Sequence, residues 1–272
     1  MTFFNFSLKE KGAVITGAAS GFGKQFALEL ARRQSDIILV DVQEEKLEEV
    51  TQLIKKETSQ KVIPIICDVS NSVQVEKMAK DVFNELDNVY ILFNNAGISP
   101  HYGLNIFRTK EAEYDQIMNI NLKGEWLIAK YICKKMKKQK FEPISGKVIF
   151  TSSITGVKPN SALPIYSISK AGVIAMTKIF AQDLAPKLTV NSISPGYHVT
   201  PIYNNDPDLI KNMIKEGGIK TPLNRLGTIE DVIKVLIFLA SPLSNFITGH
   251  NFIIDGGIAE AGVPARFIQS DI

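Results

Sequence analysis

The sequence is poor in features that would point to secreted, membrane or nucleic-acid-binding proteins. It holds two cysteines, Cys67 and Cys133, which are too few for a disulfide framework and are typical of free thiols in a reducing compartment. No apolar run approaches the roughly 18 residues that a membrane-spanning helix needs. The charges are nearly balanced and interspersed, with 31 basic against 28 acidic residues, and they therefore predict neither a nucleic acid nor a membrane as partner.

Metal ligands and targeting segments are also not evident. The three histidines, His101, His198 and His250, share no ligand spacing, so we expect no metal site and place all three in loops or on the surface. The first residues contain no basic stretch followed by a long apolar run, which argues against a signal peptide. Together with the free thiols, this predicts a cytoplasmic protein.

What the chain does have is the composition of a globular protein. Of its 272 residues, 45% are hydrophobic and 22% charged, close to the averages for folded domains. These values exclude a disordered, collagen-like or coiled-coil chain. Since no repeat, low-complexity segment or linker interrupts the sequence, we expect one domain over residues 1–272.

Short apolar segments alternate with amphipathic ones along the chain. Strands are expected at Ala13–Thr16, Asp36–Val40, Val62–Cys67, Val89–Asn94, Lys147–Ser152, Thr189–Ile193 and Asn251–Ile254. Helices are expected at Gly21–Arg33, Glu44–Glu57, Val73–Leu86, Glu111–Lys138, Ile165–Leu184 and Ile229–Ala240. Helical crossovers between nearly continuous apolar strands predict an α/β fold, a single-domain Rossmann-type doubly wound parallel seven-stranded sheet with helices on both faces.

One stretch departs from this alternation. Residues 196–223 are polar and carry Pro201, Pro207 and Pro222, with Pro195 just before them. Long insertions of this kind commonly cover a site, so we interpret this segment as a substrate lid.

A glycine-rich turn follows the first expected strand and opens the first helix. Its residues Gly17, Ser20, Gly21, Phe22 and Gly23 would let the backbone approach a pyrophosphate at the positive end of the helix. Asp41 ends the second strand at about the separation expected of a carboxylate that binds the adenosine ribose, roughly 20 residues. The pattern predicts a dinucleotide site.

The spacing Gly-x-x-x-Gly-x-Gly resembles the short-chain dehydrogenase/reductase family. Further motifs match in that family's order and span the chain from about residue 6 to 258: Cys67-Asp68-Val69, Asn94-Asn95-Ala96-Gly97, Asn121, Ser153, Tyr166-x-x-x-Lys170, Pro195-Gly196, Thr200 and Asp255-Gly256-Gly257. The resemblance implies that Asp68 and Val69 flank adenine, and that Asn95, Ala96 and Gly97 line the cofactor. It further implies that Pro195 and Gly196 bind the cofactor and that Thr200 approaches the nicotinamide carboxamide.

Tyr166 and Lys170 are the expected catalytic pair, since residues four apart share one face of a helix. A nearby ammonium favours the phenolate of a tyrosine whose pKa is ordinarily near 10, so Tyr166 can act as general acid and base. The resemblance adds Ser153 as the substrate hydrogen-bond donor, rather than the adjacent Ser152. It also adds Asn121 as the residue that orders a water in a proton relay, and gives Lys170 a second task on the nicotinamide ribose.

We therefore expect an NAD-dependent oxidoreductase that moves a hydride between nicotinamide and a secondary alcohol or ketone. NADP-binding relatives commonly carry Arg or Lys where this chain has Ser20 and Val42, which makes NADP the less favoured cofactor. One alternative is an NADPH-dependent carbonyl or 3-oxoacyl-thioester reductase. Another, of a different class, is a non-catalytic nucleotide-sensing protein. The Tyr166–Lys170 spacing disfavours the enoyl-reductase branch of the family.

The expected substrate pocket is rich in hydroxyl and amide groups. It would be lined by Ser99, His101, Tyr102, Asn160, Tyr197 and Tyr203, a set that favours a small hydroxylated substrate such as a sugar or polyol. The resemblance also implies a homotetramer or dimer that pairs through the helices of Leu122–Lys138 and Ala171–Leu184.

Overall fold

A computed structural model describes residues 6–99, 105–198, 211 and 221–261. The fold is built on one parallel sheet of seven strands in the order β3-β2-β1-β4-β5-β6-β7. The strands are β1 (Ala13–Thr16), β2 (Ile37–Asp41), β3 (Val62–Ile66), β4 (Ile91–Asn94), β5 (Gly146–Thr151), β6 (Leu188–Pro195) and β7 (Asn251–Ile254). The predicted doubly wound, seven-stranded parallel sheet in a single domain is thereby confirmed.

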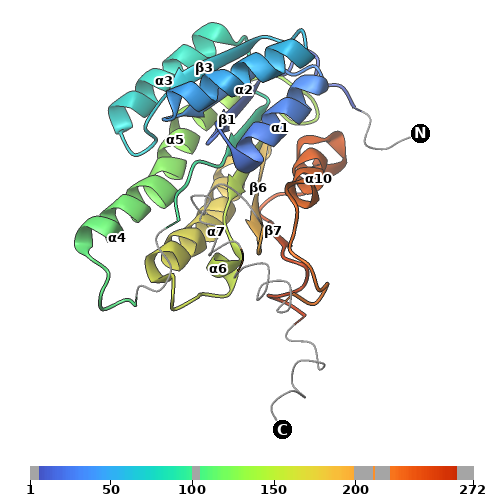
Figure 1. Cartoon of the computed structure of the whole chain (residues 1–272). Coiled ribbons are helices and arrows are strands. Elements are labelled where there is room, and N and C mark those ends of the chain that lie inside the picture. Colours follow the sequence, from blue (N-terminus) through green and yellow to red (C-terminus); the bar gives the residue numbers. More distant parts are fainter. Residues whose placement is uncertain (1–5, 100–104, 199–210, 212–220, 262–272) are drawn as a thin grey trace.

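Helices cover both faces of this sheet (Figure 1). They are α1 (Gly21–Arg32), α2 (Glu44–Glu57), α3 (Ser72–Glu85), α4 (Glu111–Met118), α5 (Glu125–Met136), α6 (Ile154–Val157), α7 (Pro164–Leu184) and α10 (Ile229–Ala240). The helices divide between the two faces of the sheet, and each group packs on its own buried hydrophobic cluster. Helices α1, α2 and α10 supply one cluster, and α3, α5 and α7 supply the other.

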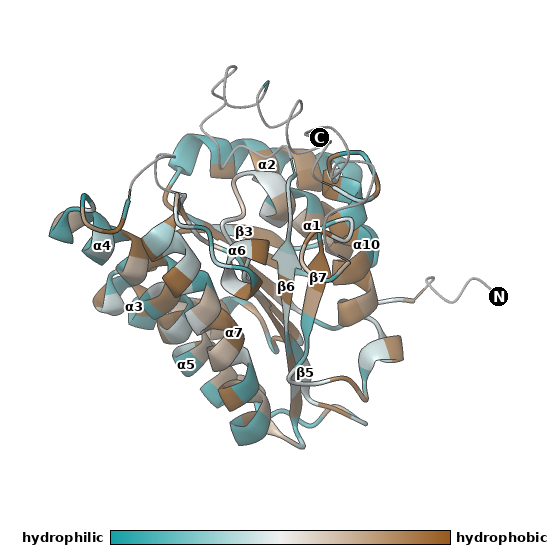
Figure 2. Ribbon diagram, turned by 90° about the horizontal axis from the view of Figure 1, so that it is seen from below, coloured by the Kyte–Doolittle hydropathy of each residue, from teal (hydrophilic) through white to brown (hydrophobic). Residues whose placement is uncertain are grey.

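The strands supply side chains to these clusters alternately. In β1, Ala13 and Ile15 join the cluster under α1, whereas Val14 joins the cluster under α5 and α7. This is the period-two pattern of a strand covered on both faces. In Figure 2, hydrophobic residues recur along the strands in the middle of the molecule, while helices such as α3 and α5 carry both hydrophilic and hydrophobic residues.

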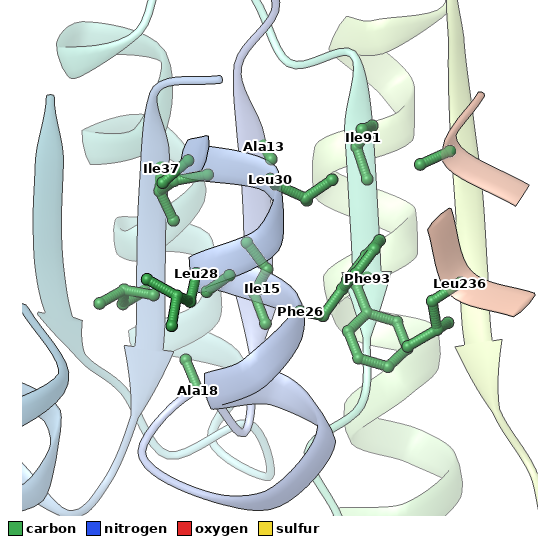
Figure 3. Packing of buried hydrophobic residues seen from close by; sticks show 14 of the residues in the cluster. Ala13, Ile15, Ala18, Phe26, Leu28, Leu30, Ile37, Ile91, Phe93 and Leu236 are labelled. Carbon is green, nitrogen blue, oxygen red and sulfur yellow. The ribbon is translucent and has the colours of Figure 1, made fainter. Parts of the chain in front are cut away.

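Aromatic packing fixes α1 against the centre of the sheet. Phe26 of α1 meets Phe93 of β4 edge to face, with ring centroids 5.1 Å apart, and Ile15 and Leu236 lie beside them (Figure 3). Edge-to-face pairs of this kind add roughly 0.5–1.5 kcal/mol to the burial of the rings. The contact holds the start of α1 at the carboxyl end of β1.

The long helical region expected over Glu111–Lys138 is present, but it is not one regular α-helix. A π-helical segment, Asn119–Gly124, separates α4 from α5. Such segments are rare and occur often at functional sites. Gly124 sits so close to Val69 that an added Cβ would lie 2.9 Å from its side chain. The apolar periodicity runs through both helices and so gave no sign of the interruption.

Two short elements were not predicted, namely α6 and a 3-10 turn, Pro242–Ser244. Each begins at a serine whose hydroxyl accepts a backbone N–H, Ser153 from Thr155 and Ser241 from Leu243. Most of the expected lid, residues 196–223, lies outside the described residues. In the part of the chain that is described, no helix is both long and apolar enough to cross a membrane.

Candidate active site

A large cleft opens at the carboxyl ends of the strands. It has a volume of about 730 Å³ and lies beside the neighbouring strands β1 and β4, where the strand order reverses. Helices leave the sheet on opposite faces at this point, which is where doubly wound sheets bind their ligands. The expected cofactor residues that line it are Gly17, Ser20, Gly21, Phe22, Asp41, Asp68, Val69, Asn95, Ala96, Gly97, Tyr166, Lys170, Pro195 and Gly196.

The glycine turn has the backbone geometry of a phosphate cradle. Gly17 has a φ of +65°, which L side chains rarely adopt. Gly23 does not line the cleft, and instead packs the start of α1 on the turn, since an added Cβ would lie 2.1 Å from the Gly17 carbonyl oxygen. The N-terminus of α1 therefore faces the cleft with its partial positive charge.

Asp41 lies at the far end of the cleft, where β2 ends. Its Oδ2 accepts the backbone N–H of Ala19 at 3.0 Å, and its Oδ1 accepts those of Val42 and Gln43. The carboxylate is thus fixed beside the glycine turn and keeps further acceptor capacity toward the cleft. Lys46 lines the same end, a nearby cation that the sequence reasoning did not weigh.

Asn95 connects three segments at the floor of the cleft. Its backbone N–H reaches the Thr16 hydroxyl at 2.9 Å and its amide nitrogen reaches the Thr16 carbonyl at 3.2 Å. The Thr151 hydroxyl donates to its amide oxygen at 3.2 Å. These bonds hold the ends of β1, β4 and β5 in register.

Tyr166 and Lys170 both face the cleft from α7. The Lys170 ammonium is almost fully buried and donates to the Thr151 carbonyl at 2.6 Å and to Glu125 Oε1 at 3.0 Å. An ammonium has three donors. These two contacts leave one, and Lys170 Nζ is 3.5 Å from where a Cβ on Gly97 would stand.

Glu125 is the residue of this site that sequence reasoning missed. It is 1% exposed, and its Oε2 has no hydrogen-bond partner. Burial raises the pKa of the Glu125 carboxyl to about 7, against the lowering effect of Lys170. The sequence did contain a sign that Glu125 is buried, because Glu125 falls on the apolar stripe of α5 with Ile128 and Ile132.

The two adjacent serines have different surroundings. Ser152 donates to the carbonyl of Lys170 at 2.8 Å and so ties β5 to α7. Ser153 accepts from the backbone N–H and hydroxyl of Thr155, both at 3.2 Å. Ser153 lines both the large cleft and a neighbouring cavity, whereas Ser152 lines the cleft alone.

Asn121 lies in the π-helical segment and does not line the cleft. Its amide oxygen accepts the N–H of Ile98 and its amide nitrogen donates to the Ile98 carbonyl, each at 2.8 Å. This paired contact anchors the segment that follows Gly97. The expected water-ordering role is not visible in these contacts.

A smaller cavity of about 350 Å³ adjoins the cleft. Ser99, Ser153, Tyr166 and Gly196 belong to both. Of the expected substrate residues, Ser99, Asn160 and Tyr197 line this cavity, while His101, Tyr102, Tyr203 and the cofactor residue Thr200 lie outside the described residues. Tyr166 therefore stands at the junction of two spaces.

His198 lies in a loop after β6, as expected, but it is not at the surface. This residue is buried against Gly227, with its Nδ1 3.1 Å from the Gly196 carbonyl. Burial lowers the pKa of its imidazole. Among the described residues, no group of three potential ligands that could hold a metal ion was found.

Such a sheet, with a nucleotide-sized cleft at its switch point and a tyrosine–lysine pair, defines an α/β dinucleotide-binding protein. A family model described as "Enoyl-(Acyl carrier protein) reductase" matches residues 17–259. The 3-oxoacyl-[acyl-carrier-protein] reductase of Thermotoga maritima is 34% identical over 254 residues, covering 92% of this chain and 98% of that protein.

Solved structures agree with these sequence matches. A short-chain type dehydrogenase/reductase from Mycobacterium marinum superposes with a TM-score of 0.85 at 32% identity, covering 95% of this chain and 98% of the other. The 3-ketoacyl-(acyl-carrier-protein) reductase of Brucella melitensis, solved in complex with NADH, has a TM-score of 0.83 at 28% identity, covering 93% and 100%. The chain belongs to the short-chain dehydrogenase/reductase family and is an oxidoreductase that uses a nicotinamide cofactor.

Proposed function

We propose that this protein is an NAD(H)-dependent oxidoreductase that interconverts a small secondary alcohol and its ketone. The observation that carries the proposal is the position of Ser153 and Tyr166 at the junction of the cofactor-sized cleft and the smaller cavity. A substrate in that cavity would meet both hydroxyls next to the space that the nicotinamide would fill. Bound nicotinamide would supply or accept the hydride.

The residues would then have distinct tasks. Tyr166 gives a proton to the substrate oxygen during reduction and removes it during oxidation. Ser153 hydrogen-bonds the same oxygen as its charge changes. The third donor of Lys170 serves the nicotinamide ribose, while its positive charge favours the Tyr166 phenolate. Asn121 supports the wall after Gly97 through Ile98.

The cleft suits the proposed cofactor at its adenosine end. Asp41 is held by three backbone N–H groups with acceptor capacity left for ribose hydroxyls, and the same carboxylate would repel a 2′-phosphate. Lys46 partly offsets that repulsion, although its ammonium donates to Gln43 at 2.7 Å. The related Brucella melitensis reductase was solved with NADH, which supports NAD over NADP.

The smaller cavity supports a compact polar substrate such as a sugar or polyol. Ser99, Thr155, Asn160, Ser161 and Tyr197 supply hydroxyl and amide groups around it. A second candidate, reduction of a 3-oxoacyl thioester with NADPH, is favoured by the Thermotoga maritima relative. The two candidate functions differ in the substrate that must enter the smaller cavity. An acyl chain needs an apolar wall, and the apolar residues of this cavity include Ile154, Leu163 and Ile258.

A substrate panel tests the proposal. The full-length protein is assayed by NADH and NADPH absorbance with polyols, sugars, cyclic ketones and a short 3-oxoacyl thioester, beside the Y166F variant. Turnover of a small alcohol or ketone with NAD(H), lost in Y166F, is expected. Preference for the thioester with NADPH would support the second candidate. Cofactor binding without any turnover would support a nucleotide-sensing protein instead.

We further propose a homotetramer in the cytoplasm. Trp126 of α5 and Ile168 and Ile179 of α7 are 42%, 45% and 58% exposed, which leaves apolar surface for a second copy. Both cysteines are free and buried, as suits a reducing compartment. Light scattering is expected to show an assembly well above the 30.1 kDa of one chain.

A further inference from the structure

The proposed function gives Lys170 a role but gives none to Glu125, the buried carboxylate that pairs with it. A carboxylate that leaves water pays a large desolvation cost unless it is paired and fully hydrogen-bonded. Glu125 is paired at one oxygen only, since Oε1 accepts from Lys170 at 3.0 Å while Oε2 has no partner. An apolar side chain would fill this place on α5 at lower cost, as Ile128 and Ile132 do further along.

We propose that Glu125 is a positioning residue that holds the Lys170 ammonium at the cleft and sets how much positive charge Tyr166 experiences. The inference rests on the proposed function, because Glu125 acts only through the lysine and tyrosine assigned there. When Glu125 is ionised, its charge offsets that of Lys170, and the phenol is less acidic. When Glu125 is protonated, Lys170 acts on the phenol with its full charge.

The surroundings of the carboxyl make Lys170 its dominant electrostatic partner. From β4, Asn94 contributes a neutral amide that donates to the Glu125 carbonyl at 2.7 Å. From α3, the charged residues Glu76 and Lys80 pair with each other at 3.0 Å. Glu76 also approaches Tyr131, further along α5.

The other neighbouring elements contribute little charge at this place. Lys123 of the π-helical segment approaches Asn119 at 3.4 Å. From α7 come Lys170 itself and Tyr166. Among the described residues, Lys170 is the charged residue that lowers the pKa of the Glu125 carboxyl. A change at Glu125 is therefore transmitted first to Lys170.

The pair is also placed to transmit this effect to the cleft. Lys170 Nζ is fixed from two sides by Glu125 and Thr151. It also lies close to Gly97, which has no side chain to separate it from the cleft. The Glu125→Gln variant keeps an acceptor at the same position while removing the negative charge. At an effective dielectric near 20, removing a unit charge from the neighbourhood of the phenol is worth on the order of one pKa unit.

The experiment measures Tyr166 ionisation directly, without turnover. Tyrosinate absorbance is titrated in the full-length wild type, Y166F, E125Q and the E125Q/Y166F double variant. Subtracting each Y166F curve isolates Tyr166 from the other six of the seven tyrosines. The pKa of Tyr166 is expected to fall by about one unit in E125Q. The E76Q variant, which removes an exposed carboxylate paired with Lys80, is expected to leave it unchanged.

An unchanged or raised Tyr166 pKa in folded E125Q would overturn the inference. If E125Q does not fold, carboxyl NMR of glutamate-labelled wild type and K170M replaces it. One carboxyl is expected to titrate near pH 7 and to move higher in K170M, and the absence of such a carboxyl would overturn the inference. Because neither readout needs a substrate, failure of the substrate panel with a shifted Tyr166 would contradict the proposed function alone.

Discussion

The ammonium of Lys170 lies 2.6 Å from the carbonyl oxygen of Thr151, the last residue of β5. This bond fixes the first half of a 21-residue helix, α7, to the carboxyl end of the sheet. Ser152 strengthens the attachment from the other direction by donating to the Lys170 carbonyl. Tyr166, one turn earlier, is thereby placed at the cleft by the backbone of the sheet.

The Tyr166→Phe variant is expected to lower kcat by at least about 100-fold, the usual effect of losing a general acid–base group. NADH affinity is expected to change little, because the phenol would meet the substrate and not the adenosine. Steady-state kinetics and fluorescence titration with NADH measure the two effects. Tyr114→Phe, on the partly exposed surface of α4, is the control, and near-wild-type turnover in Y166F would remove Tyr166 from its proposed role.

Asn121→Ala is expected to lower the free energy of unfolding by about 1–3 kcal/mol, since it leaves the N–H and carbonyl of Ile98 without their partner. Asn119→Ala is a matched control in the same π-helical segment, where the amide has only a 3.4 Å contact with Lys123. Its effect is expected to stay within about 0.5 kcal/mol. Urea unfolding compares the two, and equal losses would show that the Ile98 contact contributes nothing specific.

Lys147 gives a pH dependence of stability that is independent of function. Its side chain is 1% exposed and donates to the Ser244 hydroxyl at 2.8 Å, and burial, aided by the nearby Lys11, lowers its pKa from 10.5 to about 7. Between these values the unfolded chain binds a proton that the native chain does not. The free energy of unfolding should therefore rise with pH from about 7 to 10.5, by at most about 5 kcal/mol, and this gain is lost again as pH falls from 10.5 to 7.

The Lys147→Met variant is expected to abolish that slope. Denaturant unfolding at a series of pH values measures it, with Lys234→Met, 70% exposed in its pair with Glu230, as the control that keeps the slope. A slope that persists in K147M would assign the pH dependence to other groups.

Cofactor choice is expected to favour NAD over NADP by at least about tenfold in kcat/KM, because a 2′-phosphate facing the Asp41 carboxylate costs roughly 1–3 kcal/mol in a site open to water. The double change Asp41→Ala with Val42→Arg is expected to narrow or invert the ratio. Lys46→Ala is expected to increase the preference for NAD, since it removes the cation at that end of the cleft. Equal turnover of both cofactors by the unmodified protein would contradict the role of Asp41.

The sheet and the cleft were predictable because their signals are local. Apolar strands at regular spacing and the glycine turn before α1 each lie within a few residues. The Glu125–Lys170 pair was not predictable, because its members are 45 residues apart and on different helices. The π-helical segment was missed for a related reason, since the Asn121–Ile98 contact that accompanies it joins distant parts of the chain.

The transfer of label from NADH tests the central claim most directly. The wild-type protein is incubated with NADH carrying deuterium at both C4 positions of the nicotinamide and with the best ketone of the panel, beside folded Y166F that still binds NADH. Deuterium on the carbinol carbon of the product, formed at least about 100-fold more slowly by Y166F, is the predicted result. Product without deuterium, or equal rates for the two proteins, would contradict direct hydride transfer with Tyr166 as the proton donor.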